Sequence, residues 1–274
     1  EEILAAATSA VREAENGGEF LAAVERETGI KPQVISGTEE ARLIHLAAVY
    51  GVDVAGASAV VVDIGGGSVE ITHGAGPSLR AARSFKLGVI RLTERFVHSD
   101  PLSGRDERKL VRHIDDELAK YLRDIRTAGF DRVIGTSGTI LSLGSVAVAE
   151  RRRATDEVRN LRVPAKQIHR LRKEVTGRSI TERMKLPGLD PRRADLIVSG
   201  AVLLDTVLRH LDASEITLCD FALREGLVLD YIQRNRKHIA QAGQYPDVRR
   251  RSVIELAERC SYWREHAHQI ARLS

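Results

Sequence analysis

The chain has 274 residues, of which 43% are hydrophobic and 29% are charged, and its formal net charge is +4. This balance is typical of a globular protein long enough for two ordinary domains. No window approaches the ~18 uninterrupted apolar residues of a membrane-spanning helix, so a membrane role is not expected. The mild positive charge suits a polyanionic substrate, although an ordinary solvated surface that binds no anion would give the same net charge.

The two cysteines, Cys219 and Cys260, lie far apart and form no CxxC pair. Neither a zinc site nor a disulfide framework is expected, and both residues are interpreted as buried thiols in a reducing cytoplasm. The first residues contain no signal-peptide pattern. Because Glu1 stands where an initiator methionine would and the apolar stretch Ile3–Ala7 follows directly, we expect the sequence to begin inside a domain.

The segment before Ala57 is expected to contain two helices and a strand. The predicted elements are a helix at Glu19–Thr28, a strand at Pro32–Ile35 and a helix at Thr38–Tyr50. Thr38, which precedes two glutamates, is the expected cap of the second helix. This segment is interpreted as the end of a first domain, similar to the one that follows.

The β-branched run Ala59–Ile64 stops at three glycines and predicts a buried strand that enters a tight turn. Alternation and helical periodicity predict the later elements. They are strands at Val69–Thr72, Leu79–Phe85, Arg132–Gly135 and Glu215–Cys219, and helices at Val89–Val97, Arg105–Arg126, Asp195–Leu211 and Ala222–Arg234. This order, with an insertion between Ala149 and Pro191, predicts an α/β fold in which helices flank a mixed sheet. A polar linker at Asn235–Val248 and a helix at Arg249–Leu273 are expected to follow.

The stretch Asp63–Glu70, of sequence DIGGGSVE, combines two acids with three consecutive glycines. Glycines at a strand end let the backbone approach an anion and point N–H groups at phosphate oxygens. A carboxylate at the strand tip can hold a hard cation through oxygen. The combination predicts phosphoryl chemistry, and a simple glycine hairpin is the alternative.

Two further stretches have a structural and a chemical interpretation. The glycine turn Gly135–Thr139 follows a strand and precedes a helix, where N–H groups favour an anion, but an ordinary helix cap explains it equally well. The stretch Ser36–Leu43 places Glu39 and Glu40 in a first helical turn, where acids stabilise the helix. Capping leaves Glu40 unexplained, and its carboxylate could deprotonate a water molecule for in-line attack on a phosphoanhydride.

Together these stretches resemble the exopolyphosphatase and guanosine pentaphosphate phosphohydrolase family, which has the fold of actin, sugar kinases and heat-shock ATPases. Six stretches carry the resemblance and run in family order across nearly the whole chain. They are Ala7–Ala14 (ATSAVREA), Ser36–Leu43 (SGTEEARL), Asp63–Glu70 (DIGGGSVE), Leu87–Glu94 (LGVIRLTE), Gly135–Thr139 (GTSGT) and Asp220–Gly226 (DFALREG). One glycine motif is common, whereas six ordered motifs at compatible spacing are specific.

The resemblance implies two ribonuclease-H-like lobes with the active site in the cleft between them. Residues 1–44 would be the C-terminal part of the first lobe and 45–234 the second lobe. A linker at 235–248 and the first helix of an HD-like helical domain at 249–274 would follow. The family's first phosphate loop, Asp-x-Gly-Ser-Asn-Ser, has no match here, and no His-Asp pair follows His266 and His268. The sequence is therefore expected to be truncated at both ends and a poor catalyst as given, with these two histidines solvated rather than bound to metal.

By the same resemblance, Glu40 would be the base for the attacking water, Asp63 a metal ligand, and Glu70 a second acid that supports the metal ion or the water. Mg²⁺, or Mn²⁺ in its place, is the implied cofactor. Arg12 lies in the family's arginine-bearing motif and would contact phosphate, with a surface salt bridge as the alternative. The residues implied to hold phosphate through their backbone are Gly65, Gly66, Gly67, Ser68, Gly135, Thr136, Ser137, Gly138 and Thr139.

The first functional hypothesis is an exopolyphosphatase that releases terminal orthophosphate from inorganic polyphosphate. Arginine patches at 151–153 and 249–251 could track such a polyanion. Hydrolysis of the 5′-terminal phosphate of guanosine pentaphosphate would use the same residues. Two more hypotheses are a non-catalytic polyphosphate or nucleotide sensor and an ATP-using kinase, although binding alone needs no base at Glu40. No specific nucleic acid and no membrane are expected as partners, and a homodimer is left open.

Overall fold

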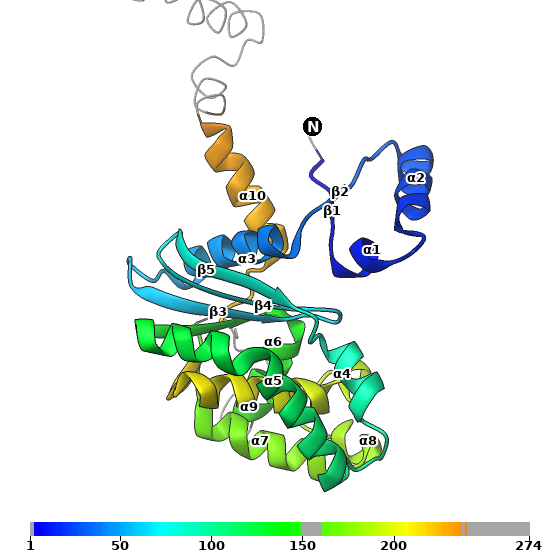
Figure 1. Cartoon of the computed structure of the whole chain (residues 1–274), viewed down its shortest axis with the longest axis vertical. Helices are drawn as coiled ribbons and strands as arrows, with labels where there is room; N and C mark the ends of the chain where they lie inside the picture. Colours follow the sequence, from blue (N-terminus) through cyan, green and yellow to red (C-terminus); the bar gives the residue numbers. More distant parts are fainter. Residues whose placement is uncertain (1–2, 150–159, 237–238, 240–274) are drawn as a thin grey trace, which may run out of the picture. The chain divides into compact units, whose positions relative to one another are not determined.

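A computed structural model describes residues 3–149, 160–236 and 239 (Figure 1). The chain forms two compact units, residues 1–228 and 229–274. The described residues contain no helix that is long and apolar enough to cross a membrane. Several features of the sequence analysis lie outside the described residues. They are most of the predicted linker, the predicted last helix, both arginine patches, Cys260 and the histidine pair.

The first unit is built on a six-stranded mixed sheet with the strand order β5-β4-β3-β6-β8-β7. Its strands are β3 at Ser58–Ile64, β4 at Val69–Ala75, β5 at Ser78–Phe85, β6 at Arg132–Thr136, β7 at Arg162–Pro164 and β8 at Glu215–Leu218. β3, β6 and β8 run parallel, whereas β4, β5 and β7 are antiparallel to the strands they pair with. The sheet confirms the predicted mixed topology and places the ends of β3 and β6 side by side.

Helices cover both faces of the sheet. Those described in the first unit are α1 at Ser9–Glu13, α2 at Gly17–Thr28, α3 at Gly37–Val52, α4 at Val89–Phe96, α5 at Gly104–Ala128, α6 at Ser137–Val148, α7 at Ala165–Gly177, α8 at Ile180–Arg183 and α9 at Ile197–Leu211, with the 3-10 helix η2 at Pro191–Arg193. Helix α10, Leu223–Arg234, begins in the first unit and ends in the second. α3 lies on one face of the sheet, and α5, α6 and α9 lie on the other (Figure 1).

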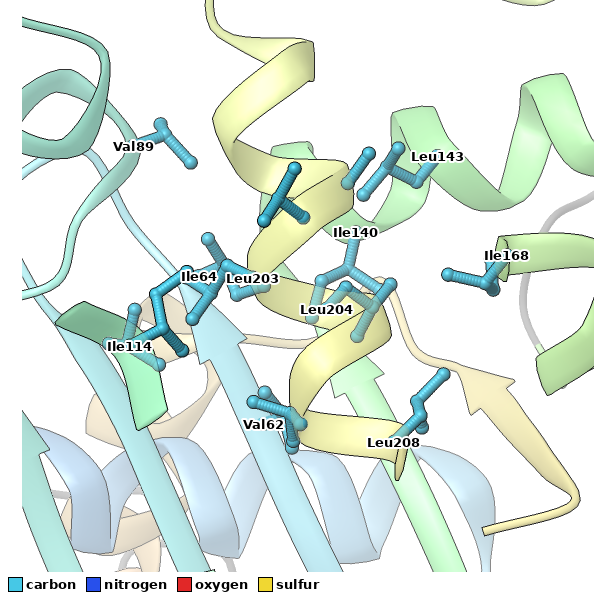
Figure 2. Close-up of a cluster of buried hydrophobic side chains, with 14 of the residues drawn as sticks. Val62, Ile64, Val89, Ile114, Ile140, Leu143, Ile168, Leu203, Leu204 and Leu208 are labelled. Atoms are coloured by element: carbon cyan, nitrogen blue, oxygen red, sulfur yellow. The ribbon is translucent and has the colours of Figure 1, made fainter. Parts of the chain in front are cut away.

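Alternate side chains of β3 pack in two separate cores. Val62 and Ile64 share the larger core with Leu203 and Leu204 of α9 (Figure 2). Val61 lies in the smaller core with α3. Because successive side chains of a strand point to opposite faces, a β-branched run that is apolar throughout can be buried on both sides. Double burial places β3 inside the sheet, and its pairing with β4 and β6 fixes the position of Asp63 near its end.

The chain before α3 forms a small separate layer. Strand β1, at Ala6–Ala7, pairs in parallel with β2, at Gln33–Val34, and α1 and α2 connect the two strands. The strand predicted at Pro32–Ile35 and the helix predicted before it are confirmed as β2 and α2, whereas β1 and α1 were not predicted, because two and five residues leave no readable periodicity. α3 crosses residue 44 without a break, and the division into lobes at that residue stays a prediction.

The predicted cap of α3 is wrong. The cap is Ser36, whose backbone is extended and whose Oγ accepts the Glu39 N–H at 3.1 Å. Thr38 already lies inside the helix. Both Ser36 and Thr38 precede acids at short spacing, so the sequence pattern alone does not distinguish them.

The insertion between Ala149 and Pro191 contributes a strand to the sheet. β7 pairs with β8, with Val163 opposite Ile216. A three-residue strand that ends in proline gives almost no sequence signal, and proline is tolerated because the strand lies at the sheet edge. Directly after β8, Cys219 is a fully buried thiol, as expected.

A test of the fold uses α5, in which five buried apolar residues recur every three or four positions: Leu110, Ile114, Leu118, Leu122 and Ile125. Leu118→Ala should lower the free energy of unfolding by about 2–5 kcal/mol, because a fully buried leucine leaves a cavity. Lys120→Ala, on the exposed side of the same helix, should change it by less than about 0.5 kcal/mol. Equal effects in urea unfolding would contradict this packing.

Candidate active site

Two acids lie opposite each other on neighbouring strands. Asp63, the second-last residue of β3, pairs with Glu70 of β4 across one ladder and with Thr136 of β6 across the other. The exposed fractions of Asp63 and Glu70 are only 6% and 2%. The hairpin therefore brings two carboxylates together at a buried position, on the two adjacent strands that the sequence predicted.

A third acid comes from the first turn of α3. Glu39 points to Arg42, with which it forms two hydrogen bonds of 2.8 and 2.9 Å. Glu40, by contrast, is only 7% exposed, and its Oε2 lies 3.3 Å from an Nη atom of Arg12. The same Arg12 nitrogen donates to the Ile35 carbonyl at 2.7 Å. The two neighbouring acids thus have different environments, and only Glu40 faces the interior.

The three carboxyl groups share one electrostatic environment. Burial, together with the nearby carboxylates of Glu70 and Glu40, raises the pKa of Asp63 to about 8. Burial and the charge of Glu40 raise the pKa of Glu70 to about 7. Burial also raises the pKa of Glu40, against the opposing effect of Arg12. One arginine thus compensates three crowded acids only in part, so the cluster favours a bound cation or a retained proton.

Ser84 of β5 connects Glu70 with the start of α3. Its hydroxyl donates to Oε1 of Glu70 at 2.7 Å, from the position directly opposite in the β4–β5 ladder. The Cβ of Ser84 also lies close to the start of α3, where a Cβ on Gly37 would be 2.6 Å away. Ser84 was not among the predicted site residues, because its role depends on strand register and on the close approach of α3.

The first glycine loop is enclosed by its neighbours. The Gly65 N–H donates to the Ser68 carbonyl at 3.0 Å, so this predicted phosphate donor is used inside the loop. The carbonyls of Gly65 and Gly66 accept N–H groups from the first turn of α4. A Cβ on Gly88 would lie 2.2 Å from the Gly66 carbonyl oxygen. This close approach of α4 to the loop therefore requires glycine at position 88.

Charged side chains attach α1 to the same loop. A Cβ on Gly67 would lie 2.7 Å from the hydroxyl oxygen of Ser9. Arg91 donates through Nε to the Gly67 carbonyl and through Nη2 to Glu13, both at 2.8 Å. Lys86 lies 3.0 Å from the same Glu13 carboxylate. An ionic cluster thus joins the N-terminal layer to the glycine loop.

The second glycine turn lies at the end of β6, beside the first. Ser137 has a positive φ of 79°, and its hydroxyl donates to the Ile64 carbonyl at 2.8 Å. Thr136 donates to the Phe221 carbonyl at 2.6 Å. Gly135 is a sheet residue whose missing side chain makes room for Ile216, since a Cβ would lie 2.5 Å from that side chain. Ser137 therefore links the second turn to the end of β3, directly before the first glycine loop.

Arg193 was not predicted as a site residue, yet its guanidinium lies against the second turn. A Cβ on Gly138 would lie 2.3 Å from an Nη atom of Arg193. Within the part of the chain that the structure describes, the Arg193 side chain forms no hydrogen bond or salt bridge, while its neighbour Arg192 is paired with Asp190 at 2.9 Å. A cation at the positive end of α6 is unfavourable unless an anion lies between them. Sequence patterns give no signal for this contact, because it joins residues 55 positions apart.

The described residues contain no group of three or more His, Cys, Asp or Glu side chains arranged to hold a metal ion. A pair of carboxylates remains a suitable donor set for Mg²⁺, which is usually bound through one or two carboxylates together with water and substrate phosphates. Asp63 and Glu70 fit this description, because burial and mutual repulsion make their charged forms costly in the absence of a cation.

Comparison with known proteins identifies relatives of this chain. The model of the Ppx/GppA phosphatase family matches residues 1–235. Exopolyphosphatase 1 of Mycobacterium leprae is 33% identical over 229 residues, which are 83% of this chain and 67% of that protein. Exopolyphosphatase 1 of Mycobacterium tuberculosis is 34% identical over 229 residues, which are 83% of this chain and 66% of that protein. The chain thus spans about two thirds of the length of these relatives.

Solved structures show the same relationship. The Aquifex aeolicus member of the Ppx/GppA family has a TM-score of 0.75 and 28% identity, over 86% of this chain and 75% of that chain. An exopolyphosphatase from Cytophaga hutchinsonii has a TM-score of 0.79 and 28% identity, over 85% of this chain and 75% of that chain. The family match extends from the N-terminal layer through the whole sheet, and the chain therefore belongs to the Ppx/GppA phosphatase family.

Proposed function

We propose that this chain carries the hydrolytic site of an exopolyphosphatase, which releases terminal orthophosphate from inorganic polyphosphate. The observation that supports this most directly is the convergence of Glu40, Asp63 and Glu70, all buried, next to two glycine loops at adjacent strand ends. Hydrolysis of a phosphoanhydride needs a positioned water, a base, and neutralisation of the phosphate charge. The names of the mycobacterial and Cytophaga relatives support the same substrate.

In this proposal Glu40 accepts the proton of the attacking water. Its raised pKa moves it toward the range in which a carboxylate is an effective base, and Arg12 keeps part of the population ionised. When a substrate phosphate enters, Arg12 can exchange its 3.3 Å contact with Glu40 for a phosphate oxygen, which leaves the carboxylate free to act on water. The backbone of Gly66 to Ser68 and of Ser137 to Thr139 then holds the phosphate from two sides.

We also propose that Asp63 and Glu70 hold Mg²⁺ or Mn²⁺. A divalent ion at this position would neutralise developing charge on the phosphate oxygens. Ser84 orients Glu70 by its 2.7 Å hydrogen bond to one carboxylate oxygen, and the Ser68 side chain contributes a second hydrogen bond to the same carboxylate. The buried thiol of Cys219 is consistent with a reducing cytoplasm as the place of action.

Guanosine pentaphosphate is the alternative substrate, since its terminal phosphoanhydride presents the same chemistry to the same residues. Phosphate release from both compounds, measured side by side, separates the two specificities. Release that requires an acceptor other than water would instead indicate a kinase. Binding without any turnover would indicate a sensor.

Replacing the base tests the mechanism. Glu40→Gln should lower kcat for orthophosphate release by about 10²–10⁴-fold, the usual size of a general-base contribution, while polyphosphate binding is retained. Glu39→Gln is the matched control, because Glu39 lies in the same helical turn but is paired with Arg42 outside the cluster. The control should leave kcat nearly unchanged. If the two variants behave alike, Glu40 is not the base.

Thermal unfolding tests the metal proposal without relying on activity. Because the pKa of Asp63 is raised to about 8, the folded state retains a proton that the unfolded state has lost, so stability falls as the pH rises from about 4 to 8. In chelator, Asp63→Asn should therefore raise Tm relative to the unsubstituted chain, and by more at pH 8 than at pH 5. Mg²⁺ should raise Tm at pH 8 for the unsubstituted chain but not for the variant. If Tm depends on pH in the same way for the two proteins, or if Mg²⁺ raises Tm equally in both, Asp63 does not hold the metal ion.

A further inference from the structure

We propose that Arg183, a buried arginine outside the catalytic cluster, is a positioning residue that presents Arg193 to the phosphate held at the second glycine turn. The proposal deepens the proposed function, on which it rests. Arg183 acts through another residue and does not contact substrate itself.

Arg183 is only 2% exposed, which is unusual for arginine. Its guanidinium donates to three backbone carbonyls, those of Ala194 at 2.7 Å, Val175 at 3.3 Å and Arg178 at 2.5 Å. It is also paired with Asp100, whose Oδ1 lies 2.9 Å away. This single side chain therefore joins the end of α7, the turn after η2 and the loop before α5.

The carbonyls that Arg183 binds are those that lack partners within their own elements. Val175 lies in the last turn of α7 and Arg178 is its C-cap, where carbonyls have no helical N–H to accept. A cation at a helix C-terminus is also favoured by the helix dipole. Asp100 supports the same junction from the other side, because its Oδ2 accepts the Ile180 N–H at 2.6 Å.

The contact with Ala194 reaches the phosphate site. Ala194 directly follows Arg193, is fully buried, and closes the η2 turn through its N–H to the Pro191 carbonyl at 3.2 Å. The hydrogen bond from Arg183 fixes the Ala194 carbonyl, so it fixes the backbone from which the Arg193 side chain extends toward Gly138. Sub-ångström placement matters here, since the guanidinium already touches the glycine backbone.

A buried arginine is rarely the most stable choice for a packed position, since apolar residues of similar volume often stabilise a fold as well or better. Its presence is explained if the irregular chain between α7 and α9 must be held in one conformation. Such a role predicts that loss of Arg183 affects phosphate affinity through Arg193, beyond its effect on stability.

The experiment is a double-mutant cycle with two readouts, the KM and kcat for polyphosphate and the Kd for pyrophosphate by calorimetry. Arg193→Gln should weaken pyrophosphate binding by about 10- to 100-fold, as expected for loss of a charged hydrogen bond. Arg183→Lys and the milder Asp100→Asn should each weaken it by about three- to tenfold, with KM changing more than kcat. Added to Arg193→Gln, neither should weaken binding further.

Three outcomes would overturn the proposal. The first is that the losses of pyrophosphate affinity in the single variants add up in the double variants. The second is normal pyrophosphate affinity in Asp100→Asn and Arg183→Lys once both are shown to be folded. The third is an equal loss of affinity in Leu118→Ala, a destabilised variant far from the site, because general loss of stability would then explain the result. A chain that binds pyrophosphate through Arg193 but releases no orthophosphate would contradict the proposed function alone, and the cycle would still decide the role of Arg183.

Discussion

The mutual repulsion of three buried carboxylates is the constraint on which the rest of the site depends. Asp63, Glu70 and Glu40 come from two strands and a helix, and all three are almost completely shielded from bulk solvent. Such a cluster is stable only if positive charge or protons are supplied to it. Arg12 supplies part of this charge on the side of Glu40. The rest of the charge must be balanced by retained protons or by a bound cation.

The geometry around this cluster is kept by contacts between segments that are distant in the sequence. Ser137 ties the second turn to the end of β3, Ser84 ties β5 to Glu70, and Gly88 lets α4 pack on the first glycine loop. Each contact is short and specific, whereas the core behind it is a continuous apolar layer on both faces of β3. Apolar packing therefore fixes the strands, and polar contacts fix the loops at the ends of the strands.

Local patterns in the sequence predicted the parts of the fold that have a clear period. The β-branched run of β3, the heptad-like spacing in α5 and the apolar face of α9 all appear within a few residues of their expected bounds. β7 and β1 were missed because they are three and two residues long and depend on partner strands for their definition. Ser36 was missed as the cap because Thr38 fits the same pattern.

The same distinction applies to the site. The acids could be predicted because they lie in motifs next to glycines, where the chemistry has a sequence signature. Arg193 and Ser84 could not, because each becomes relevant only when the chain brings it against Gly138 or Gly37. Gly65 was predicted to bind phosphate because it lies in the expected loop, but its N–H donates to the Ser68 carbonyl instead. Motif membership therefore indicated a candidate phosphate loop but not which of its amides are available.

The contacts that attach α1 to the first glycine loop are ionic, whereas those of the core are apolar. The attachment consists of Glu13 with Arg91 and Lys86, whose side chains are 23%, 40% and 75% exposed and are therefore all reached by water. Charge pairs of this kind weaken as dissolved ions screen them, whereas burial of apolar surface does not. The N-terminal layer can therefore loosen from the loop in concentrated salt while the sheet stays folded. Ionic strength would then act on the access of substrate to the site separately from the stability of the protein.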